Sequence, residues 1–140
     1  MLKSLSNVQI EKICKRNHIK LNGIYSKNEI PKNLKNGSYI INMEDDKPGK
    51  KGTHWTAFIK DKNNLYFDSF GEVPPNQIHN LLKKYTYNNK DVQSFDSDAC
   101  GYYCIAFLKW LQNGLSFKDF VDSFEKNALS NDKIIGGYII

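Results

Sequence analysis

The sequence QSFDSDACGYYC, residues 93–104, is a polar loop that leads into an apolar segment, with Cys100 at the junction. From Gly101 to Leu111 almost every residue is apolar or aromatic, which predicts a largely buried helix that stops at Asn113-Gly114. The Cys100 thiol is then expected at a helix N-terminus, where unpaired backbone N–H groups and the helix dipole favour a thiolate. We interpret Cys100 as a candidate nucleophile, with a role in packing as the alternative.

Size and composition indicate one globular domain over residues 1–140. The chain has 140 residues, 40% of them hydrophobic and 13% aromatic, enough for a single core. No apolar run approaches the length of a membrane span, and residues 1–4 lead into a polar, helix-like segment and not into a signal sequence. We therefore expect an intracellular monomer without a membrane partner.

The cysteines and histidines do not form a metal-binding pattern. Three cysteines without a secretory signal predict reduced thiols, and the three histidines do not pair with them at zinc-finger spacing. We expect no metal and no cofactor.

Positive charge is concentrated in the first third of the chain. Residues 1–53 contain 11 Lys and Arg against 5 Asp and Glu, whereas residues 54–140 contain 9 against 10. A basic face of this kind can attract DNA or an acidic partner, and an ordinary solvated surface is the alternative. The residues concerned are Lys12, Lys15, Arg16, Lys20, Lys27, Lys32, Lys35, Lys47, Lys50 and Lys51.

The first predicted element is a helix over residues 7–16. Ser6 and Gln9 have the spacing of a capping box, and Leu5 and Ile10 that of a hydrophobic staple. Residues 17–36 contain several turn signals and are predicted to be loop and short pieces. The expected buried side of the helix consists of Val8, Ile10, Ile13 and Cys14.

Three segments rich in β-forming residues predict strands at 38–43, 54–60 and 65–68, with a loop over 44–53. The last two strands are separated by a short polar turn and form a hairpin. His54 begins one strand and Asp68 ends its neighbour, so both side chains are expected at the same edge of the sheet. This arrangement suits an imidazole oriented by a carboxylate; an accidental histidine is the alternative.

The rest of the chain is predicted to add helices to this sheet. We expect a helix over 76–85, a strand over 91–95 and an amphipathic helix that is capped by Ser116. His18 and His79 are expected at the surface. The apolar segment 133–140 is expected to add a strand or to dock in a groove.

Cys100, His54 and Asp68 together supply a thiol, a base that can take its proton, and a carboxylate that can orient the base. Gln93 adds a fourth group, because its side-chain amide can return over the helix N-terminus and stabilise an oxyanion together with the Cys100 backbone N–H. We also expect Gly101 to leave room on the substrate side of the helix.

The motifs around these residues resemble the adenovirus-type maturation proteases (adenain). The shared features, within residues 50–112, are Gly52-Thr53-His54-Trp55, Tyr66-Phe67-Asp68-Ser69-Phe70-Gly71, and Gln93 followed by Ala99-Cys100-Gly101 and Cys104. The wider clan includes the Ulp/SENP-type SUMO proteases. The chain departs from the adenovirus enzymes in having Asp68 where they usually have Glu, and it is shorter than either group.

The resemblance implies an α+β cysteine endopeptidase, with a mixed sheet packed against a central helix that carries the nucleophile. It implies cleavage of viral capsid or core precursor proteins after Gly-Gly or Gly-x, in the virion and the infected cell. The segment Ile134-Ile135-Gly136-Gly137-Tyr138 fits this cleavage pattern and suggests self-cleavage or substrate mimicry, with an apolar strand bent at glycine as the alternative.

Adenovirus proteases are stimulated by DNA and by a disulfide-linked peptide. No residue here matches the cysteine that holds that peptide, whereas the basic first third leaves DNA as a candidate partner. A Ulp-type isopeptidase acting on SUMO or ubiquitin, and a non-catalytic binding module, are the other hypotheses.

Overall fold

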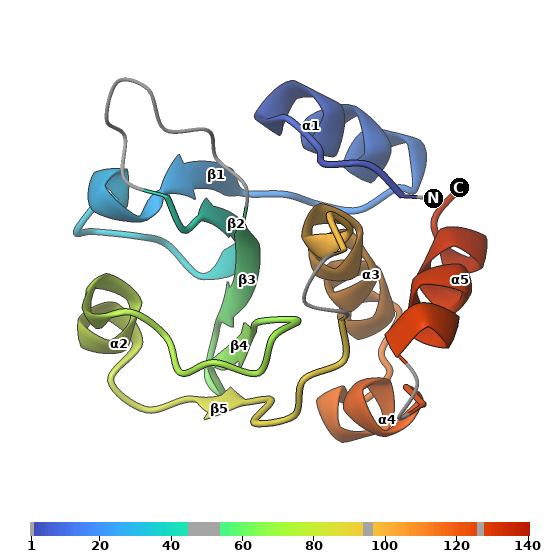
Figure 1. Cartoon of the computed structure of the whole chain (residues 1–140). Coiled ribbons are helices and arrows are strands. Elements are labelled where there is room, and N and C mark those ends of the chain that lie inside the picture. The colour runs from blue at the N-terminus through green and yellow to red at the C-terminus, as the bar shows by residue number, and fades with distance from the viewer. Residues whose placement is uncertain (1, 45–53, 94–96, 126–127) are drawn as a thin grey trace.

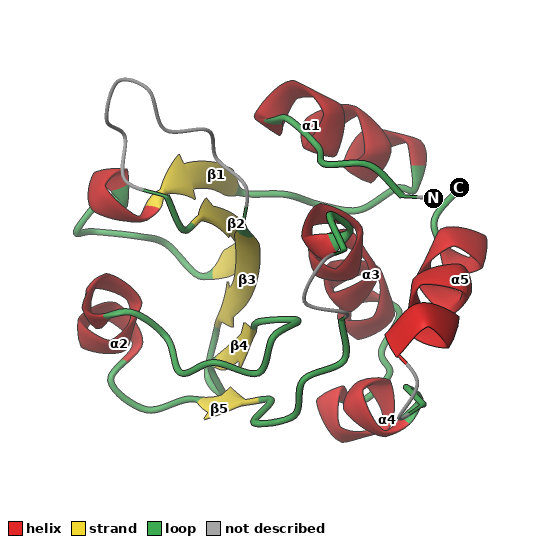
Figure 2. Ribbon diagram, in the orientation of Figure 1, coloured by secondary structure: helices red, strands yellow, loops and turns green. Residues whose placement is uncertain are grey.

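The computed structural model describes residues 2–44, 54–93, 97–125 and 128–140 (Figure 1). The elements are α1 (Asn7–Arg16), β1 (Gly23–Ser26), the 3-10 helix η1 (Lys27–Glu29), β2 (Gly37–Asn42), β3 (Trp55–Lys60), β4 (Leu65–Phe67), α2 (Asn76–Leu82), β5 (Thr86–Tyr87), α3 (Cys100–Gln112), α4 (Phe117–Asp122) and α5 (Ala128–Tyr138) (Figure 2).

The strands form one mixed sheet in the order β1-β2-β3-β4-β5. β1 and β2 are parallel, β3 is antiparallel to both β2 and β4, and β4 and β5 are parallel. The β3–β4 hairpin aligns Ala57 with Phe67 and Ile59 with Leu65. The α+β fold with a mixed sheet, expected from the sequence, is confirmed.

Side chains that alternate along the strands build two cores, one on each face of the sheet. Ile40, Ala57 and Phe67 belong to the larger core with α3. Their sequence neighbours Ile41, Phe58 and Tyr66 belong to the smaller core under α2. Figure 1 shows α1, α3, α4 and α5 on one side of the sheet and α2 on the other. α3 is therefore a central helix, and its first turn is held by contacts from both the sheet and the other helices.

α1 has the predicted bounds and the predicted capping box, but the predicted burial of Val8 is wrong. Ser6 Oγ accepts the Gln9 backbone N–H at 3.2 Å, and Gln9 Oε1 accepts that of Ser6 at 2.8 Å. Val8 is 54% exposed, whereas Ile10 is fully buried. Residues two apart on a helix point roughly 200° apart, so both cannot face the core.

Most of the C-terminal segment belongs to a helix, α5, so the first of its two predicted alternatives, an added strand, is wrong. Ile135 in α5 and Ile139 just after it are both buried, and the Ile139 backbone N–H donates to the Ile135 carbonyl at 3.1 Å, so the two lie one turn apart on the same face. Gly136 and Gly137 lie inside this helix. Cleavage at the predicted self-cleavage site would therefore require α5 to unwind first, because proteases bind their substrates extended.

Several other boundaries differ from the sequence prediction. β1 lies inside the segment predicted to be mostly loop, and α2 ends at Leu82 because Lys83 has a φ of +63°. Residues 91–93 are not in a strand: the backbone N–H groups of Val92 and Gln93 both donate to the Ser69 carbonyl. Residues 94–95 of that predicted strand, and 45–53 of the predicted loop, lie outside the described residues.

Among the helices of the described residues, none combines the length and the apolar character that crossing a membrane requires.

Candidate active site

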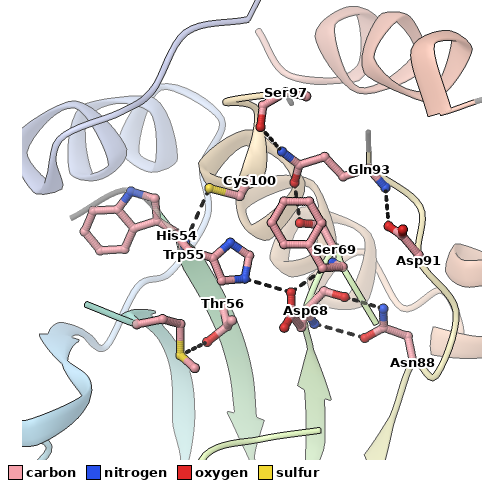
Figure 3. Close-up of polar contacts among 12 residues, drawn as sticks. His54, Trp55, Thr56, Asp68, Ser69, Asn88, Asp91, Gln93, Ser97 and Cys100 are labelled. Carbon is pink, nitrogen blue, oxygen red and sulfur yellow. Dashed lines mark hydrogen bonds and ion pairs between the residues drawn. The ribbon is translucent and has the colours of Figure 1, made fainter. Parts of the chain in front are cut away.

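Cys100 is the first residue of α3 and is 3% exposed (Figure 3). The backbone N–H of Trp55, at the start of β3, donates to Cys100 Sγ at 3.4 Å. A Cβ atom on Gly101 would lie 3.2 Å from Leu5 Cδ1. Gly101 thus makes room for the segment before α1, and this contact was not expected from the sequence.

His54 and Asp68 meet at the open end of the β3–β4 hairpin, as the hairpin geometry predicts. His54 Nε2 lies 2.8 Å from Asp68 Oδ1. The imidazole is stacked on Phe70, with 4.7 Å between ring centroids and 26° between planes. Figure 3 shows the other ring nitrogen turned to the side on which Cys100 lies. The imidazole therefore lies between the carboxylate and the thiol.

The surroundings of His54 favour its protonated form. Burial alone lowers the pKa of His54, but the hydrogen bond to Asp68, the neighbouring Cys100 and the negative charge of Asp68 raise it, to about 9. The imidazole is therefore largely protonated at neutral pH, in the form that can give up a proton.

Asp68 is held in place by backbone and side-chain contacts. Its Oδ1 also accepts the Phe70 backbone N–H at 2.9 Å. Asn88, 3% exposed, accepts the Asp68 backbone N–H at 3.0 Å through Oδ1 and donates to the Asp68 carbonyl through Nδ2. Sequence reasoning missed Asn88, because it contacts backbone 20 positions away and no local motif marks it.

The turn after Asp68 requires glycine at position 71. The Gly71 backbone N–H donates to the Asp68 carbonyl at 2.8 Å, and Gly71 has a φ of +73°. A Cβ atom there would lie 2.8 Å from the Lys90 carbonyl carbon. The turn therefore holds Asp68 close to the irregular segment, after β5, that leads to Gln93.

Gln93 is almost fully buried, at 1% exposure, and both ends of its amide are engaged. Ser69 Oγ donates to Gln93 Oε1, and Gln93 Nε2 donates to the Ser97 carbonyl at 2.7 Å. An amide NH₂ carries two protons, so a second donor remains on Nε2. Ser69 was missed as a functional candidate because its hydroxyl contacts a side chain 24 positions away, which no local pattern marks.

The structure thus brings the four sequence-predicted site residues together from three parts of the chain. His54 and Asp68 come from the hairpin, Gln93 from the segment after β5, and Cys100 from α3. This arrangement can support attack by a thiol on a carbonyl group.

The other two cysteines lie in the core, as expected. Burial, with a contribution from Glu11, raises the pKa of Cys14 to about 11. Burial also raises the pKa of Cys104 well above its usual range. Among the described residues, which include all three cysteines, there is no disulfide, and no group of His, Cys, Asp and Glu could hold a metal ion.

A cleft of roughly 700 Å³ adjoins the site at Trp55. One wall comes from the start of α1, another from β1 and η1. The lining includes Leu5, Asn7, Tyr25, Glu29, Asn42 and Trp55. None of His54, Asp68, Gln93 and Cys100 lines this cleft, and Trp55, whose backbone N–H donates to Cys100 Sγ, is the residue that joins it to the site.

The sequence matches no known family profile and no curated protein sequence. Its fold is similar to that of the ASFV pS273R protease in its selenomethionine crystal form, with a TM-score of 0.53 and 18% identity. The overlap covers 74% of this chain and 44% of the protease, so this chain spans less than half of that protein's length. It is also similar to the central domain of the uncharacterised Lpg1148 protein of Legionella pneumophila, with a TM-score of 0.51, 11% identity and 98% of each chain covered. The chain therefore shares, at a distance, the α+β fold of the ASFV pS273R protease.

Proposed function

We propose that this protein is a cysteine endopeptidase in which Cys100 is the nucleophile, His54 the acid and base, Asp68 the orienting carboxylate and Gln93 an oxyanion donor. The observation that carries the proposal is the His54–Asp68 pair, 2.8 Å apart, beside a cysteine at the start of a buried helix. The fold shared with the ASFV pS273R protease supports a peptidase as the class of enzyme.

In the proposed reaction, Cys100 Sγ forms a bond to the carbonyl carbon of the scissile peptide, and the carbonyl electrons move to oxygen. The Cys100 backbone N–H and the second Nε2–H of Gln93 stabilise that oxyanion. Protonated His54 gives its proton to the amine nitrogen as the C–N bond breaks, which leaves a thioester on Cys100. Water then attacks the thioester while His54 takes one of its protons. The C–S bond breaks, the acid is released, and the Cys100 sulfur is left beside protonated His54, as before the attack.

For the substrate, we propose viral capsid or core precursor polypeptides cut after Gly-Gly or Gly-x, with the enzyme acting in the virion and the infected cell. Support comes from the motif resemblance and from the shared fold. An isopeptidase that acts on SUMO or ubiquitin is the second candidate, favoured by an aspartate at position 68, as the SUMO proteases have.

Incubation of wild type and Cys100→Ala with three substrates tests the proposal and separates the two candidates. The substrates are an apolar-x-Gly-Gly peptide, a SUMO precursor and a capsid-type precursor. We expect wild type to cleave the peptide and the capsid-type precursor, and Cys100→Ala to cleave nothing. Cleavage of the SUMO precursor alone would favour the isopeptidase. If wild type cleaved none of the three substrates, both the endopeptidase and the isopeptidase would be excluded.

We also propose DNA as a partner of the basic first third. Lys12, Lys15, Arg16 and Lys20 are all exposed, on α1 and just after it. Contacts of lysine and arginine with phosphates weaken steeply with salt. A mobility-shift titration with duplex DNA should show binding at low salt that is lost as salt rises, and an absence of binding at low salt would exclude this partner.

A further inference from the structure

Asp132, in α5, accepts hydrogen bonds from two hydroxyl groups on either side of Cys100. Ser97 Oγ lies 2.7 Å from Asp132 Oδ2, and Tyr103 Oη lies 2.6 Å from Asp132 Oδ1. Such bonds to a carboxylate are roughly twice as strong as those between neutral groups. α5 is thereby joined both to the segment that precedes Cys100 and to α3 itself.

Ser97 connects this carboxylate with the site. Its Oγ accepts the backbone N–H of Ala99 at 3.2 Å, and its carbonyl accepts Gln93 Nε2 at 2.7 Å. Ala99 directly precedes Cys100. The position of Ser97 therefore affects both the direction of the Gln93 amide and the backbone that enters α3.

Asn131, beside Asp132, holds the other end of the same segment. Its Nδ2 donates to the Val92 carbonyl at 2.9 Å, and Asn131 is fully buried. Val92 directly precedes Gln93. Two adjacent residues of α5 thus anchor the residue before Gln93 and the residue that receives the Gln93 amide.

We propose that Asp132 is a positioning residue for the oxyanion donors. Acting through Ser97, it fixes the side-chain amide of Gln93 and the backbone N–H of Cys100 in the geometry that stabilises negative charge on a carbonyl oxygen. This inference rests on the proposed cysteine peptidase function. It gives α5 a role in the site that the sequence did not indicate, since Asp132 lies just before the apolar segment 133–140 for which a strand or a docked tail was expected.

Two probes of Cys100 separate positioning of the donors from general damage to the site. Acetyl-Leu-Ala-Gly-glycinal forms a hemithioacetal whose oxygen needs the oxyanion donors, whereas iodoacetamide alkylates the thiol without them. Both are measured on wild type, Asp132→Ala and Asp132→Asn. Ser97→Ala breaks the same link by removing one hydroxyl and serves as a second variant should Asp132→Ala fail to fold. Asp122→Ala is the control, because Asp122 is an exposed carboxylate of α4 that pairs with Lys118.

Asp132→Ala and Ser97→Ala should weaken aldehyde binding roughly 10- to 100-fold while the alkylation rate stays within about twofold of wild type. Asp132→Asn keeps one acceptor oxygen and should recover most of the loss. In a Gln93→Ala background, Asp132→Ala should weaken aldehyde binding by a clearly smaller factor than in wild type, because one of the two donors that Asp132 positions is already absent.

Unchanged aldehyde binding in Asp132→Ala or Ser97→Ala, or an equal fall in aldehyde binding and alkylation, would overturn the positioning role. If wild type binds the aldehyde but cleaves no peptide, the proposed peptidase function fails while the positioning role still stands. If wild type does not bind the aldehyde, both fail.

Discussion

His54 Nε2 and Asp68 Oδ1 lie 2.8 Å apart, at the open end of a hairpin whose register places the end of β4 beside the start of β3. One strand pair thus supplies both the imidazole and the carboxylate that orients it. The hydrogen bond fixes the ring so that its other nitrogen is on the side of Cys100 (Figure 3). The chemistry proposed for the site depends on this pair, and so does its response to pH.

Asp68→Asn should shift the alkaline limb of the pH profile to lower pH. Asp68 helps to raise the pKa of His54 to about 9 in wild type, whereas burial lowers it. Without the carboxylate the lowering by burial is less opposed, so the pKa of His54 should fall. Protonated His54 is needed to expel the amine, so wild-type kcat/KM should fall as pH rises through about 9. A profile of kcat/KM between pH 6 and 10 measures the shift, and an unmoved limb would disprove that Asp68 sets the charge of His54.

The same pair should make stability depend on pH. The folded-state pKa of His54, about 9, lies above its ordinary value of 6.5, so folding favours the protonated form. The stabilisation is fully present below 6.5 and is lost as pH rises through 9. Chemical unfolding of wild type and Asp68→Asn at several pH values should show this loss of stability in wild type alone. If the free energy of unfolding changed with pH in the same way in both proteins, the His54–Asp68 pair would not be its cause.

Gln93→Ala should reduce kcat roughly 100-fold, in line with the loss of one oxyanion donor in other enzymes. Ser69→Ala should reduce it by a smaller factor, because the Ser69 hydroxyl only orients the amide through Gln93 Oε1. Steady-state kinetics should show KM little changed in both. A Ser69→Ala loss larger than that of Gln93→Ala would contradict this order.

Asn88→Ala should lower the free energy of unfolding by about 1–3 kcal/mol, because the buried backbone N–H and carbonyl of Asp68 lose their partners. Activity should fall as well, since Asp68 loses its support. Asn89→Ala, at an exposed neighbouring position, is the matched control and should change neither. Urea unfolding and kinetics measure both effects, and equal stability of the two variants would contradict the role of Asn88.

Gly71→Ala should destabilise the protein more than Gly114→Ala. Both glycines have positive φ, +73° and +83°, a strain of about 1–2 kcal/mol for alanine. At Gly71 the added Cβ would also lie 2.8 Å from backbone carbon of Lys90, whereas at Gly114 it would meet nothing within 4 Å. Thermal unfolding compares them, and similar losses would show that the close approach at Gly71 is easily relieved.

Much of the fold could be predicted because local signals agreed with the final packing. The capping box predicted α1, and the apolar run predicted α3. Two segments rich in β-forming residues around a polar turn predicted the hairpin with His54 and Asp68. These are short-range patterns, and each recurs in the structure within one or two residues of its expected place.

The remaining features depend on contacts between distant residues. Asn88 and Ser69 act on backbone or side chains more than 19 positions away, and no local pattern marks them. α5 contains Gly136-Gly137, which weaken a helix, and the β-branched pair Ile134-Ile135, which locally favours a strand. It is helical because Ile135 and Ile139 pack on one face against the core, while Asn131 and Asp132 bind the segment before α3.

The central claim is that Cys100, activated by His54, is the nucleophile. Wild type, Cys100→Ala and His54→Ala are incubated at pH 7 with a peptide vinyl sulfone ending in Gly-Gly, and the modified residue is identified by mass spectrometry. The account predicts one adduct on Cys100 of wild type, none on Cys100→Ala, and much slower modification of His54→Ala, with Cys14 and Cys104 unmodified because burial raises their pKa values. Modification of Cys14 or Cys104 in place of Cys100, or an equal rate in His54→Ala, would contradict it.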